Sequence, residues 1–204
     1  GENTLRLKNQ KTISLPEFMI GKTPVTEAQF AAFAKATGYR GNSNTDNCVA
    51  QGRNHPMTQV SCSDAEGFCR WLSKVSDLNI RLPTEAEWEK AARGVDGRKY
   101  PWGNENPTNK TCNTSDTGPK MTTPVGNYPA GNSSYGCEDM AGNVWEWTSS
   151  NYDSNRRVLC GGSWIDSAHN ARSAYRCSHA PGIRFNNYGF RICVSLSQPT
   201  LTKP

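Results

Sequence analysis

The phrases Gly161-Gly162-Ser163-Trp164 and Gly189-Phe190-Arg191-Ile192 bracket the stretch that decides how this chain is interpreted. Residues 160–188 contain no Lys, Glu, Gln or Met, although these four types make up 29 of the 204 residues. About four of them would be expected in a stretch of this length if the composition were uniform. Apart from Trp164, every residue there can be encoded by a codon that ends in C. The composition therefore sets this segment apart from the rest of the chain.

Five other phrases precede the bracketed stretch, and together they carry a family resemblance over residues 18–194. They are Lys22-Thr23-Pro24-Val25-Thr26, His55-Pro56-Met57-Thr58-Gln59-Val60, Arg81-Leu82-Pro83-Thr84-Glu85-Ala86-Glu87-Trp88-Glu89, Tyr100-Pro101-Trp102-Gly103 and Met140-Ala141-Gly142-Asn143-Val144-Trp145-Glu146-Trp147. In this order the chain resembles the formylglycine-generating-enzyme (sulfatase-modifying factor) type of the C-type lectin fold. The resemblance implies a single α+β domain over residues 1–204 with little regular secondary structure.

In the enzymes of this family, two cysteines that follow the Gly-Gly-Ser phrase bind copper and oxidise a substrate thiol. The aligned positions in this chain are Asp166 and Ala171. Because a soft ion such as Cu(I) needs thiolate ligands, the resemblance implies that this chain is not an enzyme. The alternative is a formylglycine-generating-type thiol oxidase or a degenerate enzyme relative. It stays open because Cys160 and Cys177 flank the segment, and the register before Cys177 is one residue longer than in the enzyme.

Other members of the fold hold non-haem iron with a cluster of histidines, and this chain has only three. His55 lies in one of the family phrases and is interpreted as a structural hydrogen-bonding residue. His169 and His179 lie in the bracketed segment and are interpreted as contact residues. The sequence therefore predicts no three-histidine iron site.

The even number of cysteines permits disulfides without showing which would form. The eight are Cys48, Cys62, Cys69, Cys112, Cys137, Cys160, Cys177 and Cys193. Since no two of them are spaced as Cys-x-x-Cys, a structural zinc site is not favoured. The pairing stays open at this point.

The codon composition of residues 160–188 resembles the variable region of proteins diversified by retroelements. Diversity-generating retroelements randomise the adenines of AAC asparagine codons, and several of their variable proteins use this lectin fold. The resemblance implies a fixed backbone set and an interleaved set of contact residues. The fixed set is Gly161, Gly162, Ser163, Trp164, Ala168, Ala171, Arg172, Ser173, Ala174 and Arg176. The contact set is Ile165, Asp166, Ser167, His169, Asn170, Tyr175, Cys177, Ser178, His179, Gly182, Ile183, Arg184, Phe185, Asn186, Asn187 and Tyr188.

This interpretation predicts a non-catalytic protein that binds a ligand, most simply a protein or other macromolecule on a cell or particle surface. Tyr175, Phe185 and Tyr188 are the expected anchors, because rigid aromatic side chains give large contact area at a small entropy cost. Drift in an Asn- and Ser-rich loop of an ordinary family member is the alternative explanation of the same composition.

The charge and hydropathy of the chain exclude some partners and locations. The net charge is +5 and the Lys and Arg residues form no basic run, so nucleic acid is not favoured as a partner. No apolar stretch approaches the roughly 20 residues that span a bilayer. Residues 1–15 lack the apolar core of a signal peptide. We expect an extracellular or bacterial cell-surface protein, whose export signal or lipid anchor would belong to a longer precursor.

The last family phrase predicts a calcium site. In the family, the loop that matches residues 139–146 wraps a calcium ion, which prefers hard oxygen ligands. The resemblance implies carboxylate ligands at Asp139 and Glu146 and main-chain carbonyl ligands at Gly142 and Val144. In the alternative interpretation Glu146 only accepts hydrogen bonds from loop amides. In either case the role would be structural.

Three helices are predicted from capping boxes, in which a Ser or Thr caps the first turn and a Glu or Gln three residues later bonds back to it. They begin at Thr26, Ser63 and Thr84. Gly38 and Gly94 are predicted to end the first and the third helix. Apolar residues at helical spacing predict the buried side of the second helix, and they are Phe68, Trp71, Leu72 and Val75.

The remaining segments are predicted to be short strands and loops. Strands are expected at residues 18–20, 158–160 and 190–194. Residues 100–135 are rich in Gly, Pro, Asn, Ser and Thr and are expected to form loops. The residues after about 195 are expected to form a disordered tail.

Overall fold

The computed structural model describes residues 4–6 and 12–196. The helices are α1 (Glu27–Thr37), α2 (Ser43–Gln51), α3 (Cys62–Ser76) and α4 (Glu85–Arg93), with a 3-10 turn η1 (Pro129–Gly131). The strands are β1 (Thr4–Arg6), β2 (Thr12–Ser14), β3 (Phe18–Ile20), β4 (Ile80–Arg81), β5 (Trp145–Asn151), β6 (Arg157–Cys160), β7 (Arg176–His179), β8 (Tyr188–Phe190) and β9 (Cys193–Ser195). The predicted tail lies outside the described residues, apart from its first residue.

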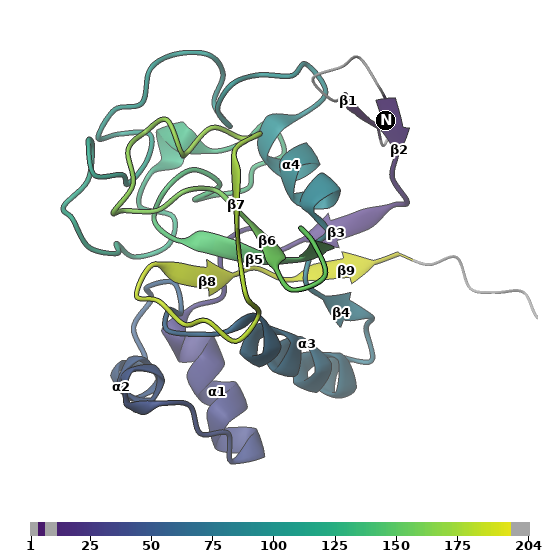
Figure 1. Ribbon diagram of the computed structural model, residues 1–204, viewed down its shortest axis with the longest axis vertical. Coiled ribbons are helices and arrows are strands. Elements are labelled where there is room, and N and C mark those ends of the chain that lie inside the picture. The colour runs from purple at the N-terminus through teal and green to yellow at the C-terminus, as the bar shows by residue number, and fades with distance from the viewer. Residues whose placement is uncertain (1–3, 7–11, 197–204) are drawn as a thin grey trace, which may run out of the picture.

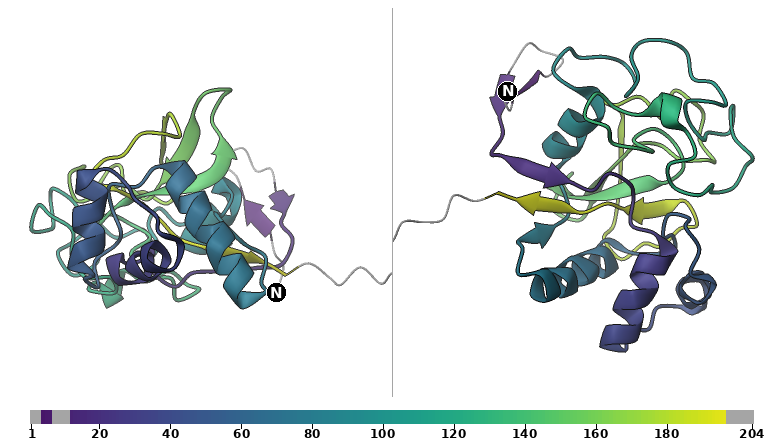
Figure 2. Two further views of the ribbon diagram at one scale, coloured as in Figure 1. Left: turned by 90° about the horizontal axis from the view of Figure 1, so that it is seen from below. Right: turned by 180° about the vertical axis from the view of Figure 1, so that it is seen from behind.

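Strands β3 to β9 form a middle layer between two groups of other elements, whereas β1 and β2 pair with each other on the α4 side (Figure 1). Helices α1, α2 and α3 lie on one side of this layer, and α4 lies on the other with the long loops. The view from behind shows the same arrangement (Figure 2). Residues 94–144 contain η1 as their regular element, which confirms the loop prediction for residues 100–135. Among the described residues, no helix is long and apolar enough to cross a membrane.

Two sheets organise the middle layer, and the larger one frames the bracketed segment. Strand order is β7-β6-β5-β8 in the larger sheet and β3-β9-β4 in the smaller one. The β5–β8 pair is parallel, with Trp145 opposite Tyr188 and Trp147 opposite Phe190. On the other side of β5, Cys160 of β6 is opposite Glu146. Residues 160–188 therefore begin and end on the two neighbours of one strand.

Helices α1 and α4 begin and end where the sequence predicts. The Thr26 side chain accepts a hydrogen bond from the Gln29 amide, whose side chain accepts one from the Thr26 amide. Thr84 and Glu87 form the same reciprocal pair at the start of α4. Gly38 and Gly94 follow the last turns with positive φ angles of 69° and 70°. The fold class is confirmed as α+β by these helices together with the mixed larger sheet and the antiparallel smaller one.

Three element predictions are wrong in detail. Helix α3 is capped by Ser61, which is bonded to the Asp64 amide at 3.2 Å, and not by Ser63. The predicted strand at residues 190–194 is two strands, β8 and β9, because the chain leaves one sheet at Arg191 and joins the other. Val75 is 64% exposed and does not belong to the buried side of α3. Helix α2 was not predicted.

The main core gathers aromatic rings from α1, α3 and β8. Phe30 stacks on Phe68 with ring centroids 5.7 Å apart, and Phe68 meets Phe190 edge-on at 5.5 Å. All three side chains are buried, and for Phe68 this confirms the predicted buried side of α3. This core fixes β8 and hence the end of the bracketed segment.

Candidate recognition face

The bracketed segment leaves β6 through two glycines that no other residue could replace without strain. Gly161 and Gly162 have φ angles of 101° and 73°. A Cβ atom on Gly162 would lie 3.0 Å from the backbone of Ala171, which is tighter than most real contacts, so the neighbouring backbone would have to shift. The segment then forms a loop, crosses the front of the molecule as β7 and returns through a second loop to β8 (Figure 1).

Most of the predicted fixed set is placed where a scaffold requires. Gly161, Gly162, Ser163, Ala171 and Ser173 are buried. Arg176 of β7 forms ion pairs with Glu85 at 2.6 Å and Glu89 at 2.9 Å, so it holds β7 to α4. Trp164, Ala168, Arg172 and Ala174 are only half-buried. Trp164 was placed in the fixed set, but its side chain does not belong to the buried core.

The predicted contact set is graded in exposure. Ile165, Ser167, His169, Gly182, Phe185 and Asn186 are exposed. Asp166, Asn170, Tyr175, Cys177, Ser178, His179, Ile183, Arg184 and Asn187 are half-buried. Tyr188 is buried. We use the name recognition face for Ile165, His169, Tyr175, His179, Phe185 and Asn186.

Tyr175 is the centre of one aromatic group on the recognition face. Its ring lies 6.1 Å from that of the buried Trp145 and 5.7 Å from the exposed His169. The Arg172 guanidinium lies 5.4 Å from the centre of the Tyr175 ring. Tyr175 thus has a fixed inner neighbour and exposed outer neighbours, as an anchor for a ligand requires.

A second aromatic group contains Phe185, His179 and Tyr188. The Phe185 ring meets the Tyr188 ring edge-on at 5.1 Å and the His179 ring at 5.8 Å. Tyr188 lies beneath, edge-on to Trp147 at 5.6 Å, and is only 5% exposed. The prediction that Tyr188 is an exposed anchor is wrong, because β8 is inserted beside β5 and its side chains join the core.

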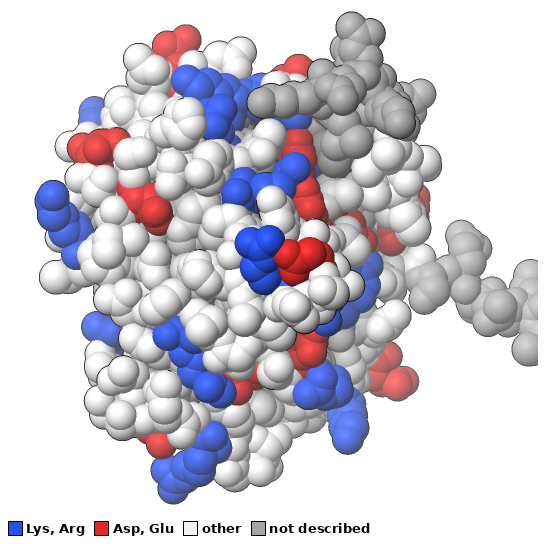
Figure 3. Space-filling model, in the orientation of Figure 1, with Lys and Arg blue, Asp and Glu red and all other residues white. Residues whose placement is uncertain are grey.

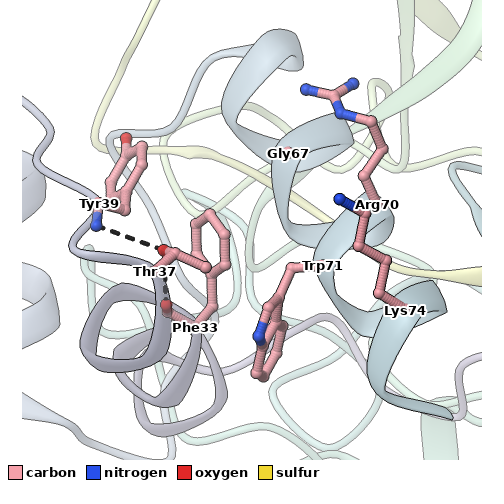
Figure 4. A pocket seen from close by; sticks show the side chains of 7 residues that line it. All are labelled: Phe33, Thr37, Tyr39, Gly67, Arg70, Trp71 and Lys74. Carbon is pink, nitrogen blue, oxygen red and sulfur yellow. Dashed lines mark hydrogen bonds between the residues drawn. The ribbon is translucent and has the colours of Figure 1, made fainter.

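Surface charge on this side of the molecule is mixed. Figure 3 shows acidic and basic side chains interspersed over the face that β7 crosses, without a large area of one sign. A pocket of about 430 Å³ lies elsewhere, between the end of α1 and α3. Phe33, Tyr39 and Trp71 line it (Figure 4). No residue of the bracketed segment lines this pocket, so the recognition face is separate from it.

The two positions that the resemblance aligns with copper-binding cysteines, Asp166 and Ala171, carry no thiol. The Asp166 carboxylate accepts hydrogen bonds from the Trp145 indole at 2.8 Å and from the Ser163 hydroxyl. Ala171 is fully buried. The carboxylate is thus held against the protein, and the second position offers only a methyl group.

The thiols near this place are poor substitutes for the missing pair. Burial raises the pKa of Cys177 to about 12 and raises that of Cys160 well above its ordinary value. Protonated thiols are weak metal ligands and weak nucleophiles. All eight cysteines are free thiols in the structure.

The three histidines contact different partners. His55 Nδ1 lies 3.0 Å from the Thr122 hydroxyl, in agreement with a structural role. His169 Nε2 lies 2.8 Å from Arg172, and His179 packs against Phe185. Within the described residues, no group of three or more His, Cys, Asp or Glu side chains is placed to hold a metal ion.

The predicted calcium ligands differ in how well they fit a cation. Both Glu146 oxygens accept hydrogen bonds from the buried Arg191, at 2.6 and 2.7 Å, and one also accepts from the Trp88 indole. A calcium ion would therefore have to share Glu146 with an arginine. Asp139 fits better, because its buried carboxylate accepts from the Gly126 amide at 2.7 Å and burial raises its pKa to about 6. The calcium site, with Gly142 and Val144 as carbonyl ligands, stays a prediction.

Arg184 was predicted as a contact residue, but its side chain points back to α3. Its Nε and Nη2 atoms donate to the two Asp64 oxygens at 2.8 and 3.0 Å. The sequence did not reveal that Asp64 and Gln59 contact this segment. The Gln59 backbone amide donates to the Phe185 carbonyl at 3.0 Å. The Ser-x-x-Asp spacing of Ser61 and Asp64 was the available signal.

Comparisons with known proteins agree with the resemblance. The family model of the Sulfatase-modifying factor enzyme 1-like domain matches residues 1–196. The Inactive C-alpha-formylglycine-generating enzyme 2 of Bos taurus is 40% identical over 162 residues, which cover 71% of this chain and 52% of that protein. The Formylglycine-generating enzyme of Streptomyces coelicolor is 34% identical over 256 residues, which cover 88% and 79%. The chain thus spans about half the length of the inactive bovine relative.

Solved structures of similar fold include proteins named for variability. PvdO from Pseudomonas aeruginosa superposes with a TM-score of 0.79 at 24% identity, over 96% of this chain and 92% of that chain. Treponema denticola variable protein 1 gives 0.75 at 23% identity, with coverages of 96% and 92%. The Major Tropism Determinant U1 variant gives 0.57 at 14% identity, over 95% and 55%. These identities support the fold alone. The family match and the sequence relatives show that the chain belongs to the formylglycine-generating enzyme (sulfatase-modifying factor) family.

Proposed function

We propose that this chain is a non-catalytic ligand-binding protein whose recognition face contacts a protein or other macromolecule on a cell or particle surface. The observation that carries the proposal is the division within residues 160–188. Buried glycines, Ser163 and Ala171 hold the backbone, whereas Ile165 and Phe185 are 54% and 44% exposed. Large apolar side chains exposed on a rigid support are typical of a contact surface.

The relatives support the proposal in their names. The bovine relative is described as inactive, and two structures of similar fold are a variable protein and a tropism determinant. By this analogy the segment would be diversified by a retroelement, and the protein would act outside the cell or at a bacterial surface. The DNA beside the gene tests the first point. A near-copy of the segment that differs mainly at adenines supports it, and the lack of such a copy contradicts it.

The binding proposal is tested with fluorescently labelled protein on a panel of intact bacterial cells and phage particles. We expect saturable binding to at least one surface, and at least a tenfold loss of affinity in Phe185→Ala or Tyr175→Ala. Arg156→Ala is the matched control, because Arg156 lies on the exposed β5–β6 hairpin and pairs with Asp153. Binding that survives both aromatic changes would show that the recognition face is not the contact surface.

The competing function is thiol oxidation with copper, as in active members of the family. Because Asp166 and Ala171 replace the two thiols, we expect no oxygen consumption above background with Cu(I) and a cysteine-containing sulfatase peptide. The Streptomyces coelicolor enzyme serves as the positive control. Sustained turnover by this chain would refute the non-catalytic assignment.

A structural calcium ion remains part of the proposal. Asp139 and the carbonyls of Gly142 and Val144 would bind it, and Glu146 would be shared with Arg191. The ion would neutralise a buried carboxylate whose pKa is otherwise raised. Its role would be to stiffen the loop before β5, not to take part in chemistry.

A further inference from the structure

The second loop of the bracketed segment lies against the N-terminus of α3. The Cys62 amide donates to the Pro181 carbonyl at 2.9 Å, and the Gln59 amide donates to the Phe185 carbonyl at 3.0 Å. The first of these bonds satisfies an amide in the first turn of α3, which has no partner within the helix. Both bonds use loop carbonyls, which every residue type supplies, so they can form with many loop sequences provided that the loop is held in place.

Arg184 lies between these two backbone contacts in the loop, and its side chain adds a third contact with α3. Its planar guanidinium forms a bidentate pair with Asp64, and such pairs are both strong and directional. The Asp64 side chain is only 9% exposed, against 31% for Arg184. Asp64 is also oriented independently, because it accepts from the Ser61 amide at 2.8 Å and the Ser61 hydroxyl at 2.7 Å. The acceptor for Arg184 is therefore pre-positioned by the cap of α3.

The electrostatics of Asp64 agree with this geometry. Burial acts to raise the pKa of Asp64, but hydrogen bonds from Arg184 and Ser61 outweigh it, so the pKa is lowered. Tyr39 also faces Asp64 and Arg184, and burial followed by the Asp64 charge raises the pKa of Tyr39 to about 12. The carboxylate is thus ionised at neutral pH and the tyrosine is not.

The two residues that follow Arg184 are exposed, whereas the Arg184 side chain is paired with Asp64. Phe185 follows directly and is 44% exposed, and Asn186 is exposed as well. By contrast, the Nε and Nη2 donors of Arg184 are used by Asp64, so its guanidinium is directed at α3. A shift of the loop would move the Phe185 ring and its contacts with His179 and Tyr188.

We propose that Arg184 is a positioning residue that fastens the loop of residues 181–187 to α3, and that position 184 stays arginine while the exposed positions beside it vary. Arg184 acts through the loop: it sets where Phe185 and Asn186 project from the recognition face. This inference deepens the proposed function, and it can be tested without any ligand.

Hydrogen exchange of the Gln59 and Cys62 backbone amides measures how firmly the loop is held against α3. In Arg184→Ala we expect the Gln59 and Cys62 amides to exchange at least tenfold faster, with unchanged rates in α1 and β5. Arg184→Lys, which keeps the charge but not the fork, should recover part of the protection, and Arg156→Ala should match the wild type. The difference in exchange protection between the wild type and Arg184→Ala should also decrease as the pH falls through the lowered pKa of Asp64, because protonation of Asp64 breaks the ion pair. Unchanged exchange at both amides in Arg184→Ala would overturn the inference.

A selection for folding tests whether position 184 can vary. Codons 184 and 185 are randomised separately in the displayed protein, and the variants that resist protease are sequenced. We expect arginine to be enriched at 184 and many residue types to be recovered at 185. Free variation at 184 would refute the inference and leave the binding proposal intact. Failure of the wild type to bind any surface would count against the binding proposal alone.

Discussion

Asp166 has a side chain that is used within the protein, although it stands in the segment expected to contact a ligand. The Trp145 indole and the Ser163 hydroxyl both donate to its Oδ2 atom, and the Ser115 amide donates to its carbonyl at 2.9 Å. The residue therefore ties the first loop of the segment to β5 and to the loop before it. A position that is predicted to contact a ligand thus has a structural role in this chain, through the residue that occupies it.

Aromatic residues in and beside the segment should differ sharply in their effect on stability. Phe190→Ala and Tyr188→Ala remove buried rings and should lower the free energy of unfolding by about 3–5 kcal/mol. Phe185→Ala removes a ring that is 44% exposed and should cost only about 0.5 kcal/mol, the usual range at a surface. Chemical denaturation of the three variants measures these differences. If Phe185→Ala were as costly as Phe190→Ala, the recognition face would be part of the core.

At the scale of elements, a buried ion pair joins β5 to Arg191, the residue that follows β8. Glu146 of β5 and Arg191 are both fully buried, and the Glu146 Oε2 and Arg191 Nε atoms lie 2.6 Å apart. Arg191 also donates to the carbonyls of Gly21 and Glu138, at 2.9 and 3.0 Å. The pair thus links the two sheets with the loop that precedes β5, at the point where the chain passes from β8 to β9.

Removal of one member of this pair should be severely destabilising. Glu146→Gln leaves the Arg191 charge buried without compensation, and we expect a loss of about 3–5 kcal/mol in the free energy of unfolding. Asp153→Asn is the control, since it breaks an ion pair on the exposed hairpin and should leave the melting curve unchanged. Equal stability of Glu146→Gln and the wild type would mean that Arg191 finds other partners.

Asp139 should make stability depend on pH and on calcium. Its pKa is raised from 3.8 to about 6 by burial, so the folded state binds the proton more tightly than the unfolded chain does. The stability that this group contributes is full below pH 4 and is lost as the pH rises through about 6. In EDTA at pH 7, Asp139→Asn should therefore be more stable than the wild type by about 1–3 kcal/mol, and the difference should vanish near pH 4.

Calcium should reverse this order, because it stabilises the folded wild type by mass action. Added calcium should raise the melting temperature of the wild type and leave that of Asp139→Asn unchanged. Melting curves that are identical in EDTA and calcium would remove calcium from the account while leaving the pH prediction standing.

The capping rules succeeded where one cap was unambiguous and failed where two competed. Thr26 and Thr84 each start a single possible box, and both helices begin there. Before α3, Ser61-Asp64 and Ser63-Glu66 overlap in the sequence. The buried Ser61 is the residue that caps α3, because its partner Asp64 also pairs with Arg184. Helix α2 escaped prediction because it has no apolar stripe: it is held by its Asn42 cap and by packing against α1.

At the scale of the whole molecule, the fold could be predicted because the family phrases lie at fixed structural points. Gly161 and Gly162 form a turn that requires positive φ, and Trp147 and Phe190 fill the core. The recognition face could be predicted only in part. The sequence predicts a fixed set and a contact set, but only packing reveals that Tyr188 faces the core. Packing also shows that Arg184 turns toward a helix more than a hundred positions earlier in the chain.

The pairing of β3 with β9 has a mechanical consequence. Phe18 is opposite Ser195 and Ile20 is opposite Cys193, and the Leu196 amide donates to the Glu17 carbonyl at 3.2 Å. Tension applied between residues 17 and 196 would therefore load these bonds one after another, like a zipper, instead of all at once in shear. In an optical-tweezers experiment with handles at these two residues, β3 should peel away at low force. Handles placed within β5 and β8, whose parallel strands would slide past each other, should require a much larger force to separate.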